Sequence, residues 1–169
     1  MKTRHPLLAL LVSSLLGAIA LLTCGCSGGF LSDTDTVVVG WRELGVVPQC
    51  DVAAPSGIVR IDFPAGTVTR IHRVYRCEGS AAAGTRPKGS YVEEDGKSVT
   101  MTPDQKATLL ESAEGVELRK IDECLGQDGR SYFINVAGGG SYTDGISFGC
   151  DTIAVGHEAL YSDASSLVP

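Results

Sequence analysis

The sequence of 169 residues has no excess of positive charge, because 14 Lys and Arg stand against 20 Asp and Glu. The formal net charge of −6 argues against nucleic-acid binding through general electrostatics. Beyond residue 26, no Cys/Cys or Cys/His pair has the close spacing of zinc ligands, and no acidic cluster has the spacing of a calcium loop. We therefore expect no nucleic-acid partner, no metal and no cofactor.

The chain also lacks an apolar run long enough to cross a bilayer. Residues 7–22 form an apolar stretch of 16 residues, whereas a membrane-spanning helix needs roughly 20. The stretch follows the basic residues Lys2 and Arg4 and precedes small residues, which is the layout of a signal peptide. An uncleaved membrane anchor is the alternative interpretation.

The end of this segment resembles a bacterial lipoprotein signal, in which an apolar residue and two small residues precede the Cys that receives the lipid. Cys26 follows Gly25 and fits this pattern, and Cys24, with Leu21 upstream, is the alternative lipidation site. The resemblance covers about the first 26 residues and implies a diacylglycerol and a fatty acid such as palmitate on the Cys. Neither Cys is followed by Asp, which implies an outer-membrane or surface location rather than inner-membrane retention. A plain secreted protein is the other interpretation.

The composition divides the chain into four parts. Residues 1–25 are the predicted signal peptide, 26–35 a flexible tether of small and polar residues, 36–161 a single globular domain and 162–169 a frayed tail. From residue 26 onward the chain has 144 residues with 12 basic and 20 acidic groups, a formal charge of −8. A chain of about this length buries enough surface for a hydrophobic core.

Four cysteines lie in the predicted domain, and an even number in an exported chain indicates two disulfides. The interval from Cys50 to Cys77 and the interval from Cys124 to Cys150 each contain a hairpin-like pattern. We therefore predict the pairs Cys50–Cys77 and Cys124–Cys150, each closing a hairpin at its open end. Pairing of Cys77 with Cys124 is the alternative.

The predicted fold is α+β, a small antiparallel sheet with disulfide-closed hairpins and one packed helix. The helix is expected at about 103–114, because Thr102, Pro103 and Gln105 supply an N-cap, a first-turn proline and a capping box. The apolar residues after this N-terminus are expected to form the face of the helix that packs. They are Ala107, Leu109, Leu110 and Ala113. The expected strands are 36–44, 57–63, 68–76, 98–101, 116–121, 132–136 and 142–148, with a loop at 81–89 and a charged turn at 93–96.

The first hairpin carries a candidate anion or partner patch of Arg60, Arg70, His72 and Arg76. If Phe63 faces Thr67, Arg60 lies opposite Arg70, and like charges in that position destabilise a sheet unless an anion intervenes. An acidic protein, a phosphate-bearing glycan or an anionic lipid head group would suit such a patch. The alternative is a solvated outer face with carboxylates nearby.

Ser147 lies in a Gly-x-Ser-x-Gly pattern, which is typical of hydrolase nucleophile elbows. Its expected place inside a returning strand does not suit that role, so we predict no catalytic residue. The Gly138–Gly140 run lacks the Lys-Ser/Thr of a phosphate-binding loop and is expected to be a hairpin turn.

We interpret the chain as a lipid-anchored cell-envelope protein that acts as a non-enzymatic binding or inhibitor-like module. The contact regions would be the hairpin tip 64–67 or the loop 80–90. A small serine hydrolase using Ser147 and a passive envelope lipoprotein are the alternatives.

The signal resemblance makes a prediction about the mature protein. Its intact mass is expected to equal the chain from Cys26 onward plus a diacylglycerol and a fatty acid, because cleavage precedes the lipidated Cys. Cys26→Ser is expected to remove the lipid, whereas Cys24→Ser, which falls in the discarded segment, is expected to leave the mature mass unchanged. A mass without lipid on the native protein contradicts the anchor.

Overall fold

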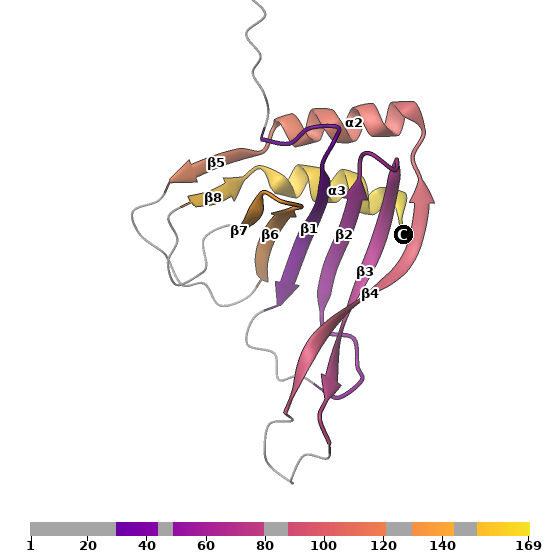
Figure 1. Cartoon of the computed structure of the whole chain (residues 1–169), viewed down its shortest axis with the longest axis vertical. Helices are drawn as coiled ribbons and strands as arrows, with labels where there is room; N and C mark the ends of the chain where they lie inside the picture. Colours follow the sequence, from indigo (N-terminus) through magenta and orange to yellow (C-terminus); the bar gives the residue numbers. More distant parts are fainter. Residues whose placement is uncertain (1–29, 44–48, 80–87, 121–129, 144–151) are drawn as a thin grey trace, which may run out of the picture.

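In the computed structural model, the protein is built on one antiparallel sheet of six strands in the order β4-β3-β2-β1-β6-β7 (Figure 1). The structure describes residues 30–43, 49–79, 88–120, 130–143 and 152–169. Strands β1 to β4 pair in succession, and the β6–β7 hairpin pairs with the other side of β1. The strands are β1 (Thr36–Glu43), β2 (Ser56–Asp62), β3 (Thr67–Cys77), β4 (Gly89–Thr100), β6 (Arg130–Val136) and β7 (Gly140–Thr143).

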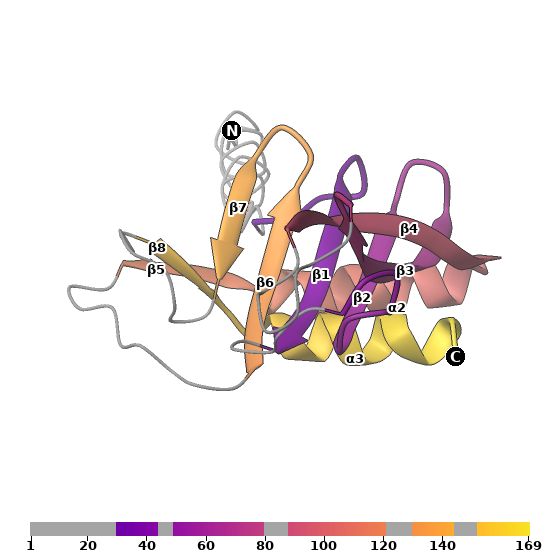
Figure 2. The same cartoon turned by 90° about the horizontal axis from the view of Figure 1, so that it is seen from below.

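Two helices lie on the same side of this sheet (Figure 2). Helix α3 (His157–Leu167) contacts β1, β2, β3 and β6, and α2 (Pro103–Glu114) lies alongside α3. A separate two-stranded ribbon pairs β5 (Glu117–Lys120) with β8 (Thr152–Val155), the strand that leads into α3. The predicted α+β class with an antiparallel sheet is confirmed, and strands dominate it.

The hydrophobic core lies between the sheet and the helices, because alternate residues of each strand point to that side. The helices contribute Leu160 and Ala164 from α3 and Leu109 from α2, each no more than 1% exposed. Burial of a Val, Leu or Ile side chain stabilises the fold by about 1.5–3 kcal/mol. The strand residues of this core are Val37, Val39, Val59, Ile61, Val68, Ile134 and Val136.

Helix α2 has the predicted bounds and the predicted capping box. The Thr102 hydroxyl accepts a hydrogen bond from the Gln105 backbone N–H (3.2 Å), and the Gln105 side-chain oxygen accepts one from the Thr102 N–H (2.8 Å). The helix buries Leu109 and Ala113, whereas Ala107 is exposed. The prediction of one packed helix is not confirmed, because α3 rather than α2 covers the sheet.

The predicted frayed tail at 162–169 is wrong. Residues up to Leu167 belong to α3, and Val168, directly after it, is fully buried. Ser and Asp are frequent between the buried residues of this helix, so the average composition of the segment is polar and does not indicate its apolar stripe. The stripe has the i, i+4, i+8 spacing of a helix, at Leu160, Ala164 and Val168.

The predicted tether at 26–35 is wrong in its described part, residues 30–35. Leu31 is 5% exposed and belongs to the core, and Phe30 packs against it. The Asp35 carboxylate then accepts a hydrogen bond from the Ser32 backbone N–H (2.7 Å), which forms a turn into β1. The polar composition of this segment therefore reflects a turn and not a flexible linker.

The β2–β3 hairpin is shifted by one residue from its predicted register. Asp62 pairs with Thr67, so the loop has four residues and Arg60 lies opposite Thr69 instead of Arg70. The Asp62 carboxylate accepts a hydrogen bond from the Ala65 N–H (2.8 Å), and Gly66 takes a left-handed φ of 66°. A shift of one residue moves a side chain to the other face of a sheet.

The predicted charged turn at 93–96 is also wrong, because these residues lie inside β4. Glu93 is paired with Arg73 of β3, Glu94 contacts Arg76 of β3, and Asp95 contacts Arg60 of β2, which explains how so many charges fit a strand. The register of β3 against β4 shifts here, with Gly96 and Lys97 both opposite Arg70. A Cβ at Gly96 would lie 2.5 Å from the end of the His72 side chain and 3.2 Å from the Arg70 carbonyl oxygen, so any larger residue here requires His72 to move.

The β6–β7 hairpin forms around the predicted glycine turn, and Val136 pairs with Gly140. The Gly139 N–H donates to the Val136 carbonyl (2.9 Å), and Gly138 has a φ of 78°. The described part of the returning strand ends at Thr143. Ser147 and the predicted pair Cys124–Cys150 lie outside the described residues.

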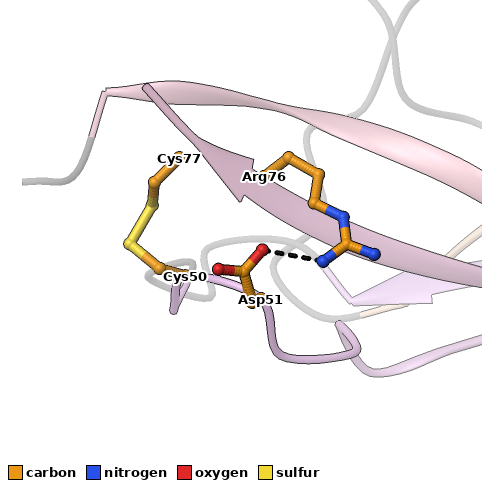
Figure 3. Close-up of a disulfide and its surroundings, with 4 residues drawn as sticks. All are labelled: Cys50, Asp51, Arg76 and Cys77. Atoms are coloured by element: carbon orange, nitrogen blue, oxygen red, sulfur yellow. Dashed lines mark hydrogen bonds and ion pairs between the residues drawn. A yellow bond between two sulfur atoms is a disulfide. The ribbon is translucent and has the colours of Figure 1, made fainter. Parts of the chain in front are cut away.

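The predicted Cys50–Cys77 disulfide is present, with its Cα atoms 5.3 Å apart (Figure 3). It ties residues 50–54 to the outer half of β3, which extends beyond the end of β2. The Asp51 N–H donates to the Tyr75 carbonyl (2.8 Å), and its carboxylate accepts from Arg76 (2.7 Å). The hairpin is therefore closed at its open end by one covalent bond and one ion pair.

The double variant Cys50→Ala/Cys77→Ala is expected to lose about 3.5 kcal/mol of unfolding free energy, because the bridge spans 27 residues and restricts the unfolded chain. Urea unfolding measures the loss. Arg76→Gln, which removes only the exposed ion pairs with Asp51 and Glu94, is the matched control and is expected to lose much less. Equal losses in the two variants, or a non-reduced digest that joins Cys50 to another cysteine, contradict this account.

Candidate functional site

The face of the sheet opposite the helices carries the candidate site. We call it the open face, since both described helices lie on the other side (Figure 2). The strand registers decide which side chains it presents, because directly paired residues point to the same side. The open-face residues used below are Val38, Arg42, Ile58, Arg60, Ile71, Arg73, Tyr91, Glu93, Phe133, Asn135 and Ser141.

An apolar floor lies at the centre of the open face. Ile58, Ile71 and Phe133 are 1%, 4% and 6% exposed and pack together, with Val38 against them. This cluster is separate from the core under the helices. Its burial indicates that the long side chains around it cover the floor.

Two arginines lie next to this floor, and each stacks on an aromatic ring. The Arg42 guanidinium carbon lies 5.7 Å from the centre of the Phe133 ring, and that of Arg73 lies 3.7 Å from the centre of the Tyr91 ring. A cation over a ring face is attracted by about 0.5–1 kcal/mol at exposed sites. Stacking of this kind leaves the N–H donors in the guanidinium plane available.

The electrostatics distinguish these two arginines from Arg60 on the same face. Arg60 forms an ion pair with Asp95, whereas Arg42 and Arg73 form none with any residue that the structure describes. Burial lowers the pKa of Arg73, and the positive charge of Arg42 lowers it further, while Tyr91 and Glu93 act in the opposite direction. Glu93, the partner of Arg73 in the sheet, offsets part of this positive charge, and no described residue forms an ion pair with either arginine.

A cavity of about 80 Å³ opens between these side chains. On its far side, the Ser141 hydroxyl donates a hydrogen bond to the Asn135 side-chain oxygen (2.5 Å). That bond occupies the acceptor of the Asn135 amide and leaves its nitrogen as a donor. The lining residues are Arg42, Ile58, Arg73, Glu93, Phe133, Asn135 and Ser141.

The structure does not bring the four residues of the sequence-predicted patch together. Arg60 lies on the open face, whereas Arg70, His72 and Arg76 alternate along the other side of β3. Arg70 donates two hydrogen bonds to the Val168 carbonyl at the end of α3 (2.7 and 3.1 Å). The expected opposition of two arginines disappears with the shift in register.

Arg76 is bound by two carboxylates at the surface. Its guanidinium contacts Asp51 (2.7 Å) and Glu94 (2.5 Å), and Figure 3 shows the first of these contacts. These hydrogen bonds, to Asp51 first and then to Glu94, raise the pKa of Arg76. The carboxylates that the solvated-face interpretation invoked are thus next to Arg60 and Arg76.

Sequence reasoning missed Arg42 and Arg73. The predicted patch took the even-numbered residues Arg70, His72 and Arg76 of this strand. Because side chains alternate along a strand, the odd-numbered Arg73 points to the other face and was left out of the patch. Arg42 is at the end of a strand far away in the sequence. Only the order β3-β2-β1 and the correct register bring the two to one face.

His157 is a second unusual group, at the start of α3. It is fully buried, and neither ring nitrogen has a hydrogen-bond partner among the described residues. Its ring packs at 5.8 Å against that of Tyr132, on the helix side of the sheet. No cluster of His, Cys, Asp or Glu suited to a metal occurs in the described part of the chain.

In comparisons with known proteins, no family model, curated protein or solved structure matches the chain. The fold and site thus define a strand-dominated α+β protein with a pair of stacked arginines on its open face. Across the described ranges, no helix combines the length and apolar character that crossing a membrane requires.

Two arginines of β3 provide a test of this description. Arg70→Met is expected to destabilise the protein by about 1–3 kcal/mol, because it removes a charged donor from the buried Val168 carbonyl. Arg73→Met keeps an apolar stem over Tyr91 and relieves the repulsion from Arg42, so its stability is expected to stay within about 1 kcal/mol of the wild type. Denaturant unfolding compares the two, and a larger loss for Arg73→Met contradicts the assignment.

Proposed function

We propose that the protein is a lipid-anchored, non-enzymatic binding module of a bacterial cell envelope that binds its ligand on the open face of the sheet. The observation that carries this proposal is the cavity framed by Arg42 and Arg73. Natural folds seldom leave two neighbouring guanidiniums without ion pairs, because their repulsion and partial desolvation cost stability. A binding role explains why neither forms an ion pair with a described residue, although Glu93 lies opposite Arg73.

The layering of the fold supports the same assignment. The helices bury one side of the sheet, and the remaining side presents an apolar floor with charged and amide groups around it. Small-molecule sites combine these two kinds of surface, because apolar area supplies affinity and a few polar groups fix orientation. The open face therefore replaces the hairpin tip 64–67 as the proposed contact region, and most of the loop 80–90 lies outside the described residues.

The proposed anchor would hold the domain near a membrane. Four residue steps separate Cys26 from Phe30, which corresponds to at most about 14 Å of extended chain. Leu31 is already part of the core. A lipid on Cys26 would therefore hold the domain close to the membrane surface, where the module meets envelope components.

A photo-crosslinking amino acid tests the proposed binding face. Placed at Ser141, which is exposed and lines the cavity, it is expected to form a discrete adduct in cells that mature lipoproteins. Placed at Ala107, which is exposed on α2, it is expected to form none. Mass spectrometry of the lipidated protein identifies the adduct.

Both positions carry small exposed residues, so neither substitution disturbs the core. Crosslinking from Ala107 alone would show that the helix side is the contact surface. Absence of an adduct from Ser141 contradicts the proposed function.

A further inference from the structure

The geometry of the cavity restricts the chemistry of its ligand. Arg42 and Arg73 each stack on a ring face, and among the described residues no oxygen accepts a hydrogen bond from either side chain, so their in-plane N–H groups are available to a ligand. The Asn135 amide nitrogen adds a third donor, because its oxygen already accepts from Ser141. Donors of this kind converge on oxyanions, and arginine in particular matches the two oxygens of a carboxylate or phosphate.

The charge of the lining selects among oxyanions. Two arginines and Glu93 give the cavity a formal charge of +1. A carboxylate neutralises this charge, since it carries a single negative charge at neutral pH. A phosphate monoester carries roughly −1.5 to −2 and would leave an excess negative charge beside Glu93.

The floor and the size of the cavity restrict the rest of the ligand. Ile58 and Phe133 present apolar surface next to the donors. A volume of about 80 Å³ holds several water molecules or a group of a few heavy atoms. Sites that enclose a whole drug-sized ligand measure roughly 300–1,000 Å³, so this cavity receives one end of a molecule.

We propose that the cavity between Arg42 and Arg73 binds the carboxylate end of a small apolar monoanion, with the first few aliphatic carbons of the molecule at the exposed edges of Ile58 and Phe133. The guanidiniums contact the two carboxylate oxygens. Asn135 donates from the β6 side, and Glu93 excludes dianions. This ligand class rests on the proposed function of the open face and makes it specific.

Sodium butyrate is the probe, and the uncharged isostere butyramide is its control. The mature lipidated protein, labelled with ¹⁵N and held in detergent micelles, is titrated while the signals of the arginine Nε–H groups, the Asn135 side-chain amide and the backbone amides are recorded. Butyrate is expected to shift the Arg42 and Arg73 side-chain signals and the Asn135 amide with saturation in the millimolar range. Butyramide is expected to bind at least about tenfold more weakly, because it lacks the charge that the arginines recognise.

Four variants test the assigned roles. Arg42→Gln and Arg73→Gln are each expected to weaken butyrate binding by about tenfold or more. Arg60→Gln is the matched control, because Arg60 lies on the same face but is paired with Asp95, and its effect is expected to stay within about twofold. Glu93→Gln raises the charge of the lining to +2 and is expected to tighten butyrate and to admit inorganic phosphate.

The outcomes separate this inference from the proposed function. Inorganic phosphate that binds the wild type as well as butyrate does, with no effect of Glu93→Gln, overturns the selection of a monoanion. Absence of saturable butyrate shifts at Arg42 and Arg73 overturns the carboxylate site. If butyrate does not bind but Ser141 still forms an adduct, the open face binds a ligand of another chemical class and the proposed function holds. If Ser141 forms no adduct either, the proposed function is wrong as well.

Discussion

Helix α3 buries Leu160, Ala164 and Val168 against β1, β2 and β3, and the other elements are positioned relative to this contact. Helix α2 packs on α3 more than on the sheet, so its place depends on that of α3. Arg70 fixes the end of α3 by donating to the Val168 carbonyl from the helix side of β3. With one side of the sheet occupied in this way, the opposite side is left to present polar and charged groups.

The arginines of the sheet have two different kinds of partner. Arg60 and Arg76 contact carboxylates at the surface, where such pairs contribute little to stability because water screens them. Arg42 and Arg73 instead lie over aromatic rings and repel each other. Aromatic residues make up only 6% of the chain, and two of them, Phe133 and Tyr91, stack against these arginines on one face of the sheet. This repulsion lies where the binding site is proposed.

The outer half of β3 and β4 forms a long ribbon that the disulfide joins to residues 50–54. Strand β4 is an edge of the six-stranded sheet, and a long exposed edge invites pairing with another chain. Glu93, Glu94 and Asp95 lie along it, and the bulge at Gly96 interrupts its ladder. Charges and a bulge are features by which natural sheets prevent edge pairing.

The sequence by itself determined the local structure: the capping box of α2, the turn at Gly138–Gly140 and the pairing of Cys50 with Cys77. Each depends on residues close together in the chain or on a count of cysteines. Only the tertiary structure decided which arginines share a face. The Asp62 side chain and Gly66 lengthened one loop by a residue, and because side chains alternate along a strand, that step separated Arg60 from Arg70. The same long-range pairing brought Arg42 and Arg73 together and gave the polar C-terminal segment a surface on which to form α3, since most helical stability comes from packing of an apolar stripe.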